Sequence, residues 1–281
     1  ETPAPGIPTL TLDGVEEEKP VAPEKKEEEQ PEVQLTPEEQ KVVDDFAEKI
    51  DITSSALVMQ YGSGAQKKIA NFSDTALANV RTKDLGEVGD EIANLVVELK
   101  SFDAGEEEKG FLGFFKKQAN RLDGMKARYD KAEVNVNKIA SSLEGHQVQL
   151  MKDIVMLDKL YETNLAYHKE LSMYILAGKK RLKRERETTL EELKAKAQRS
   201  GLPEDAQAAN DFAQQCDSFE KKLHDLELTR MVSVQMSPQI RLVQNNDRLM
   251  AEKIQSTIVN TIPLWKSQMV LALGVAHSAD A

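Results

Sequence analysis

The sequence predicts an elongated all-α protein in which a small helical head precedes a long antiparallel, coiled-coil-like helical hairpin. Apolar residues recur at alternating steps of three and four along Ala119–Arg199, a stretch without proline, and such a sustained pattern is typical of a long helix packed against partners. Only 5% of the 281 residues are aromatic and 30% are charged, which favours a helical protein over a sandwich or an α/β enzyme. The seam comprises Leu122, Met125, Tyr129, Ala132, Val136, Ile139, Leu143, Leu150, Leu157, Leu160, Tyr167, Leu171 and Tyr174.

Residues 1–35 are expected to form a disordered acidic tail. They contain six prolines, ten acidic residues and three lysines, so they carry −7 of the net charge of −11. Because large apolar groups are nearly absent, the segment cannot bury enough surface to offset its ordering entropy. We favour a solubilising leader over an interaction arm. The remaining chain is only mildly acidic, which argues against nucleic acid as a partner.

Residues 36–118 are predicted to form the helical head. Thr36 suits an N-cap and Pro37 the first position of a helix that runs to about Ile50. Asp51 or Thr53 is expected to cap the next helix. The other expected parts are a helix over Ser54–Arg81 with a break at Gly62–Gly64, a turn over Lys83–Gly89, and a helix over Glu91–Ser101 with Ile92, Leu95, Val96 and Leu99 on one face.

The segment Gly110–Lys117 places four bulky apolar residues beside two lysines. Such a cluster could touch a membrane surface, but we favour a plug that holds the head on the long helix. No apolar run approaches the roughly twenty residues of a membrane-spanning helix. A single cysteine excludes an intramolecular disulfide framework. We therefore expect a cytoplasmic protein, with membrane association as the alternative.

Residues 119–281 are predicted to form the hairpin, with its tip at 200–203. A glycine and a proline there suit a helix C-cap and a helix stop. In the return arm, Pro238 and Pro263 are each expected to kink or restart the helix. The arm repeats the three-four pattern at Phe212, Cys216, Phe219, Leu223 and Leu226.

The sequence shows no catalytic constellation. The histidines lack paired metal-ligand spacing, so no zinc or iron site is predicted. Neither a glycine-rich phosphate loop nor a nucleophile elbow is present. Cys216 lies on an apolar stripe and is interpreted as a small core residue. We expect a protein that is not an enzyme and that needs no cofactor and no metal.

A basic patch lies near the hairpin tip. It could receive the acidic tail, an anionic lipid surface or an acidic partner. Because Arg181–Glu185 and Lys183–Glu187 have the spacing of ordinary helix-surface ion pairs, we favour a solvated face. The patch consists of Lys179, Lys180, Arg181, Lys183, Arg184 and Arg186.

Three polar residues, His146, Asp153 and Asn164, interrupt the apolar seam. Polar groups at such positions commonly fix helix register, and we favour this role over a ligand site. Counting outward from the tip places Asn164 near Gln239 and His146 near Thr257, and Gln239 and Arg241 could meet Asn164 or Glu162. The same count leads to the hypothesis that Asp153 pairs with Lys253 or Arg248.

The segment Ser237–Gln268 carries Pro, Trp, Arg and several amides at fixed offsets, with shorter motifs at Gln60–Gly62, Lys83–Gly89 and Asp153–Tyr161. It closely resembles the signature of the bacterial toxic anion resistance family, the TelA/KlaA-like proteins associated with tellurite resistance. The resemblance covers roughly residues 38–276, and since relatives continue their helix past Gly274, it implies truncation at the C-terminus. The matching residues are Gln239, Arg241, Gln244, Asn246, Lys253, Thr261, Pro263, Trp265, Lys266 and Gln268.

The resemblance implies a helical cytoplasmic protein that aids survival under tellurite or cell-envelope stress, and it supplies no catalytic residues. The residues themselves favour a non-catalytic scaffold that works through protein partners, with self-association as one form. One alternative is direct oxyanion binding by Arg241 and Lys253. The other is peripheral membrane contact through Gly110–Lys117 or the region of Trp265.

Overall fold

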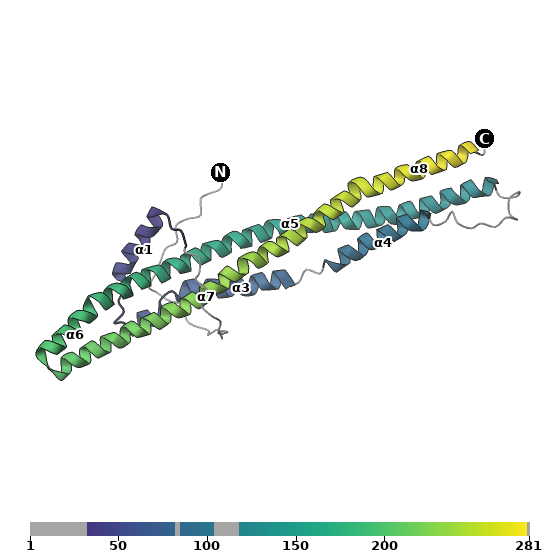
Figure 1. Ribbon diagram of the computed structural model, residues 1–281. Helices are drawn as coiled ribbons and strands as arrows, with labels where there is room; N and C mark the ends of the chain where they lie inside the picture. The colour runs from purple at the N-terminus through teal and green to yellow at the C-terminus, as the bar shows by residue number, and fades with distance from the viewer. Residues whose placement is uncertain (1–32, 82–84, 104–117, 280–281) are drawn as a thin grey trace. The chain divides into compact units, whose positions relative to one another are not determined.

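The computed structural model describes residues 33–81, 85–103 and 118–279, and these contain helices but no strand (Figure 1). The all-α fold class is therefore confirmed. None of the described helices is both long and apolar enough to cross a bilayer. The elements are α1 (Pro37–Lys49), α2 (Ser55–Gln60), α3 (Ser63–Arg81), α4 (Gly86–Asp103), α5 (Gln118–Glu187), α6 (Thr189–Ser200), α7 (Pro203–Ser256), the π-helix η2 (Thr257–Thr261) and α8 (Ile262–Ala279).

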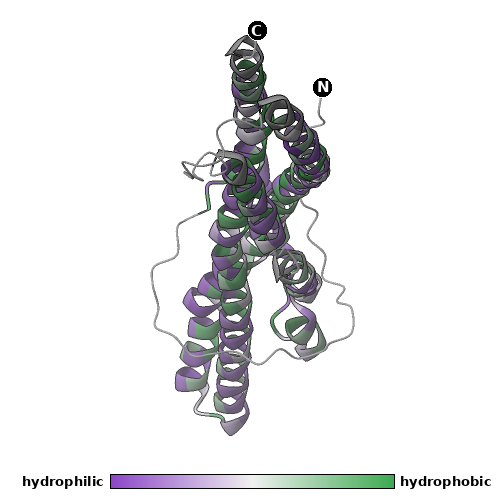
Figure 2. Cartoon of the chain, turned by 90° about the vertical axis from the view of Figure 1, so that its right-hand side faces the viewer, coloured by the Kyte–Doolittle hydropathy of each residue, from purple (hydrophilic) through white to green (hydrophobic). Residues whose placement is uncertain are grey.

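The chain divides into two compact units. Unit 1 comprises Glu1–Asn79 and Lys159–Ile240, and unit 2 comprises Val80–Asp158 and Arg241–Ala281. Helices α1, α2 and α6 belong to unit 1, α4 and α8 belong to unit 2, and α5 and α7 contribute to both. Polar and apolar residues alternate around the long helices, as the three-four pattern requires (Figure 2).

In unit 1, Thr36 caps α1 as the sequence predicts. Its Oγ1 accepts a hydrogen bond from Glu39 N at 3.2 Å, and Glu39 Oε2 accepts one from Thr36 N at 2.9 Å, which is a capping box. Lys169 of α5 donates to Glu39 Oε1 at 2.8 Å. Glu39, which completes the capping box, therefore also ties α1 to α5.

An aromatic cluster forms the centre of unit 1. The Tyr61 hydroxyl, deeply buried, donates to the carbonyl oxygen of Tyr174 at 2.6 Å. Its ring lies 5.0 Å from that of Phe219 and 6.1 Å from that of Phe46. Burial raises the pKa of Tyr61 well above its ordinary value, so the hydroxyl keeps the proton that it donates.

Two glycines allow this packing. Gly62 has a φ of +68°, and a Cβ there would lie 2.7 Å from Leu226 Cδ1. On α5, a Cβ at Gly178 would lie 2.4 Å from Leu223 Cδ2 and 3.2 Å from the Phe219 ring. Close approach of α5 and α7 in unit 1 therefore requires a residue without a side chain at position 178.

The hairpin turns between α6 and α7. Gly201 closes α6 in the left-handed conformation at φ +61°, and α7 begins at Pro203. The Ser200 Oγ accepts a hydrogen bond from Leu202 N at 3.2 Å, which helps to satisfy the backbone of the turn.

The prediction of one unbroken helix over Ala119–Arg199 is wrong at Thr188. This residue has φ −114° and ψ −78° and separates α5 from α6. Its Oγ1 donates to the Arg184 carbonyl at 2.7 Å, and Thr189 Oγ1 donates to Glu185 Oε2 at 2.5 Å. Two consecutive threonines thus bond back to the preceding turn, a competition known to perturb helices.

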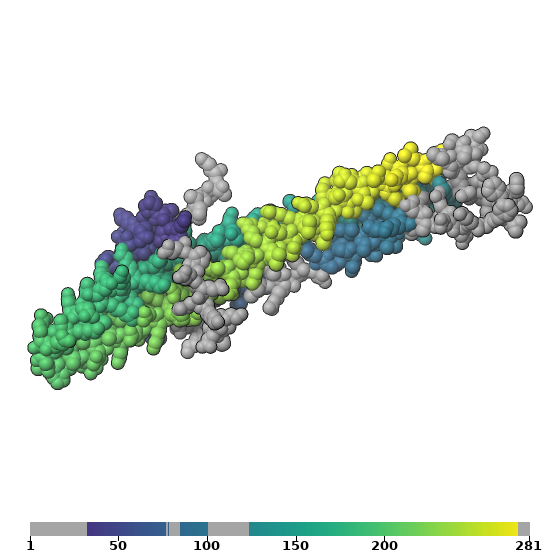
Figure 3. All heavy atoms as spheres, in the orientation of Figure 1, coloured from purple at the N-terminus to yellow at the C-terminus, as the bar shows by residue number. Residues whose placement is uncertain are grey.

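In unit 2, α4 packs beside α5, α7 and α8, and Figure 3 shows its blue surface against the yellow-green one. Leu95 of α4 is fully buried, and Val96, expected on the same face, is 39% exposed. The buried core consists of Val88, Leu95, Tyr129, Ala132, Val136, Leu143, Leu150, Ala251, Ile254, Ile262, Trp265 and Met269.

Two predicted boundaries are wrong. The Lys83–Gly89 turn is shorter than expected, because α4 already begins at Gly86. Helix α2 is capped by Ser54, whose Oγ accepts a hydrogen bond from Leu57 N at 3.3 Å. Asp51 accepts instead from the backbone and the hydroxyl of Thr53, so neither predicted cap serves α2.

The two prolines of the return arm behave differently. Helix α7 continues through Pro238, so the helix does not restart there, and the expected kink stays a prediction. Before Pro263 the helix widens into η2, and α8 begins at Ile262. Proline cannot donate to the preceding turn and its ring crowds that carbonyl, and a π-helical turn relieves both constraints. The predictions for residues 1–32 and for Gly110–Lys117 lie outside the described residues.

Candidate functional site

Two signature residues, Arg241 and Gln244, meet Asp158 of the Asp153–Tyr161 motif in unit 2, where α7 faces α5. Arg241 Nη1 donates to Asp158 Oδ1 at 2.6 Å and to Gln244 Oε1 at 2.5 Å. The fully buried Gln244 donates in turn to the Ile154 carbonyl at 3.0 Å. Hydrogen bonds from Gln244 and Arg241 lower the pKa of Asp158. This network fastens the two arms through one buried amide and one half-exposed ion pair.

The structure does not bring Arg241 and Lys253 together. Arg241 faces the carboxylate of Asp158, and Lys253 is exposed. Twelve residues separate them along a helix, which is about 18 Å at 1.5 Å per residue. An oxyanion at Arg241 would have to displace a bound carboxylate, and Lys253 would not reach it.

Two further signature residues hold α8 in unit 2. Trp265 is 6% exposed and stacks on Tyr129 with ring centroids 5.6 Å apart. Lys266 donates to Asn137 Oδ1 at 2.7 Å and lies 3.7 Å from Glu133 Oε1. These side chains serve packing between α8 and α5.

The other signature residues are exposed. In unit 2, Asn246, Lys253, Thr261 and Gln268 follow one another at steps of seven, eight and seven. The step of eight spans η2, and a π-helical turn holds one residue more than an α-helical turn. The four side chains therefore lie along one outer face of α7, η2 and α8. Gln239, of unit 1, and Pro263 are also exposed.

Of the predicted seam residues in unit 2, Asp153 is buried and accepts a hydrogen bond from Gln149 Nε2 at 3.0 Å. Its ion pair with Lys253 or Arg248 stays a prediction. His146 lies beside α4, with Nε2 3.5 Å from Glu91 Oε2, and its place near Thr257 stays a prediction.

In unit 1 the buried Asn164 donates to Ser237 Oγ and to the Ser233 carbonyl, both at 2.8 Å, within two turns of the predicted Gln239. His168 Nδ1 lies 2.8 Å from Ser233 Oγ, and that hydroxyl donates to the Arg230 carbonyl at 2.7 Å. A serine hydroxyl has one proton, so neutral His168 donates from Nδ1. The sequence did not single out His168, although it follows Asn164 by one turn.

The residues of the basic patch form ion pairs with acidic side chains of unit 1. Each of its six residues has an acidic group within 4.0 Å, so the patch fastens α1 and α7 to α5. Lys180 pairs with Asp44 and Arg184 with Glu48 of α1; Arg186 pairs with Asp217 and Glu220, and Lys179 with Glu227, of α7; Arg181–Glu185 and Lys183–Glu187 are pairs within α5.

Glu87 and Glu91 of α4 and His146 of α5 bring possible metal-ligand atoms within 4.8 Å of one another. Carboxylates and imidazole suit zinc or manganese. Ser142 Oγ also donates to Glu91 Oε1 at 2.6 Å, so the same contacts clasp α4 to α5. The group is not evident from the sequence, because Glu87 lies in a predicted turn, whereas helix α4 aligns Glu87 with Glu91 one turn later.

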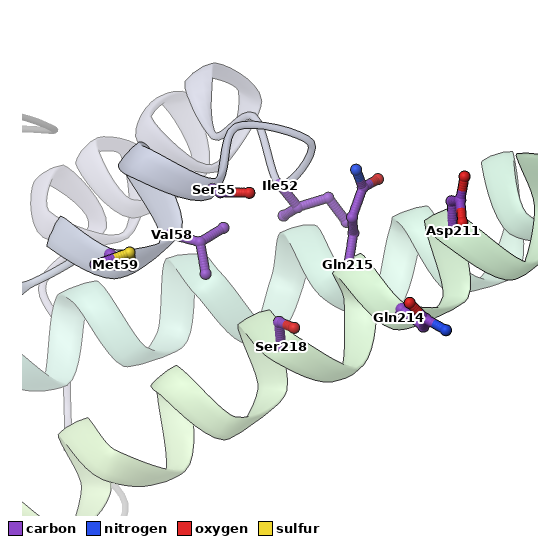
Figure 4. Close-up of a pocket in the computed structure, with 8 residues that line it drawn as sticks. All are labelled: Ile52, Ser55, Val58, Met59, Asp211, Gln214, Gln215 and Ser218. Atoms are coloured by element: carbon purple, nitrogen blue, oxygen red, sulfur yellow. The ribbon is translucent and has the colours of Figure 1, made fainter.

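A hollow of about 440 Å³ lies in unit 1 beside α2 and α7 (Figure 4). Its lining holds one ionisable side chain, Asp211, which is too little for acid–base or nucleophilic chemistry. Cys216 is fully buried, and burial raises the pKa of its thiol, as expected for a core residue. The other lining residues are Ile52, Ser55, Val58, Met59, Gln214, Gln215 and Ser218.

Comparison with known proteins points to one family. The model of the toxic anion resistance protein (TelA) family matches residues 43–281. The chain is 35% identical over 254 residues to a TelA-like protein of Staphylococcus epidermidis, covering 89% of this chain and 68% of that protein. It is 38% identical over 255 residues to YaaN of Bacillus subtilis, covering 89% and 66%. For Lmo1967 of Listeria monocytogenes the identity is 35% over 251 residues, covering 88% and 63%. No solved structure matches the chain.

Proposed function

Because the chain belongs to the toxic anion resistance (TelA) family, we propose that it acts in bacterial resistance to tellurite, other toxic anions or cell-envelope stress as a non-catalytic helical scaffold. The observation that carries this proposal is the outer face of unit 2, which we define by Asn246, Lys253, Thr261 and Gln268. Four signature residues are exposed there on one side of α7, η2 and α8. Exposed polar residues in one register suit recognition of a partner helix.

The internal contacts of the signature support a scaffold over direct anion binding. Arg241 is engaged by Asp158, and Lys266 lies beside Asn137 and Glu133. An oxyanion site would need converging cations or a free helix N-terminus. Membrane contact through Trp265 is also disfavoured, because that ring is stacked on Tyr129 inside unit 2.

Survival of tellurite-challenged cells tests the proposal. The full chain replaces the natural copy in a deletion strain, with alanine at the four outer-face positions (Asn246→Ala, Lys253→Ala, Thr261→Ala and Gln268→Ala). All four side chains are on the surface, so circular dichroism and thermal unfolding should stay close to wild type. Resistance should fall to the level of the deletion strain.

A matched control changes three exposed residues of α5 in the same unit, Lys138→Ala, Glu144→Ala and Lys152→Ala. This variant should keep full resistance. Full resistance of the outer-face variant, at equal protein level, would refute the proposed role of that face. Calorimetry with tellurite, selenite and phosphate tests the alternative of direct oxyanion binding. Binding by Arg241 and Lys253 would release or absorb measurable heat, whereas a scaffold should bind none of the three anions.

A further inference from the structure

The outer face also carries large apolar side chains that are left exposed. Leu242, Leu249, Leu264 and Leu271 are 62%, 54%, 61% and 66% exposed, and we call them the leucine stripe. We infer that the stripe is the contact surface for a second copy of this chain, packed antiparallel to the first. The inference rests on the proposed function, because it names the partner of the outer face.

The spacing places the leucines on a single line. Leu242 and Leu249 are seven residues apart, as are Leu264 and Leu271. The fifteen residues between Leu249 and Leu264 include η2, whose extra residue per turn keeps the second pair in line with the first. Each leucine of the stripe lies three residues after a polar residue; Leu249, for example, follows Asn246. Alternating polar and leucine positions form a coiled-coil seam in which the polar residues set register.

The stripe is self-complementary about its centre. Leu249 and Leu264 are equally far from the point between Ser256 and Thr257, and so are Leu242 and Leu271. A two-fold axis through that point therefore brings each leucine of the stripe against a leucine of the other copy. An isologous contact requires this match of one surface with itself. The stripe extends over about 44 Å at 1.5 Å per residue.

The charges permit the same arrangement. The exposed charged residues Arg248, Glu252 and Lys253 all lie before the midpoint. In the antiparallel pair they face the segment Asn260–Trp265 of the other copy, which contains no charged residue. Like charges therefore do not meet, whereas a parallel pair would set Lys253 against itself. Depletion of charge in the contact core is typical of protein interfaces.

The mass of the full chain in solution tests the inference. Light scattering across a dilution series should give twice the chain mass of 31.4 kDa for the wild type, and the chain mass for the double variant Leu249→Glu, Leu264→Glu. The control Val148→Glu changes an apolar residue of α5 that is 56% exposed, and it should stay dimeric. A cysteine at Ser256 should cross-link to its own copy with a short bismaleimide, and one at the exposed Lys152 should not.

The outcomes separate the two proposals. A wild type that is monomeric at every concentration overturns the second copy as partner, and so does a dimer that the double variant leaves intact. If the chain is monomeric and the outer-face variant still loses resistance, the inference fails while the proposed function stands. If the chain dimerises through the stripe and the outer-face variant keeps full resistance, the inference holds and the proposed function fails.

Discussion

Gly178 determines how closely α5 and α7 can approach in unit 1. The position of its missing Cβ lies 2.4 Å from Leu223 Cδ2 and 3.2 Å from Phe219. Both neighbours are buried in the aromatic core, so they cannot move aside without disturbing other contacts. A methyl group added at position 178 would therefore disturb the packing of the whole core of unit 1.

Gly178→Ala should lower the free energy of unfolding by about 1–3 kcal/mol, the usual cost of overpacking. Gly145→Ala is the control on the same helix, because a Cβ there meets nothing within 4 Å. It should be neutral or stabilise by about 0.5–1 kcal/mol through helix propensity. Urea denaturation measures both, and equal effects of the two substitutions would contradict the packing argument.

His168 is the second residue with a measurable consequence. It is bonded to Ser233, and burial, followed by the charge of Arg230, lowers its pKa. As pH falls, His168 therefore stays neutral in the folded protein at pH values at which the same histidine in the unfolded chain already binds a proton. Its contribution to stability is present above the unfolded pKa of about 6.5 and is lost as pH falls from there through the folded pKa.

The free energy of unfolding should therefore fall more steeply between pH 7.5 and 5.5 in the wild type than in His168→Gln. The glutamine amide can still donate to Ser233, and it does not titrate. Chemical denaturation at several pH values measures the difference between the two slopes. Parallel pH profiles would show that His168 is not held neutral by the fold.

At the scale of elements, η2 keeps α7 and α8 in one register. The buried residues Ile254 and Ile262 are eight residues apart, where a regular heptad would give seven. The same step of eight separates Lys253 from Thr261 on the outer face. One extra residue therefore preserves the inner core and the outer face together.

Deletion of Asn260 should turn η2 into an α-helical turn and rotate α8 by about 100°. Trp265, the only tryptophan of the chain, would leave its contact with Tyr129, and its fluorescence should shift to the red. Pro263→Ala keeps the extra residue and should leave the emission unchanged. An unshifted spectrum in the deletion variant would show that η2 does not set the register.

The sequence predicts the parts of the fold that depend on neighbours along the chain. The three-four pattern locates both arms, Thr36 and Pro37 locate the start of α1, and Gly201 locates the turn. The failure at Thr188 has a local cause as well, because this side chain bonds to its own preceding turn.

Contacts between distant segments could not be predicted from the same pattern. His146 meets Glu91 of α4, and the basic patch meets acids of α1 and α7. Heptad counting describes how two arms face each other, but it does not say which additional helix covers a given face. The ten signature residues came from the resemblance, and their separation into inward and outward sets came from the structure.

At the scale of the whole molecule, we propose that resistance works through contact with a protein partner. The chain spans 63–68% of the length of its relatives from Listeria, Bacillus and Staphylococcus. Some of its signature side chains hold helices together, and the others face outward. Among the described residues, the thiol of Cys216 is buried and Arg241 is paired with Asp158. Reduction of tellurite would need an accessible thiol or a redox cofactor.

The most direct test of this claim is the loss of tellurite in the presence of the purified full chain. A thiol and a reduced nicotinamide are supplied as reductants, and tellurite remaining in solution is measured over time. The account predicts the same rate with and without the protein, and no tellurite retained by the protein after gel filtration. Protein-dependent consumption, or retention in proportion to the protein, would contradict it.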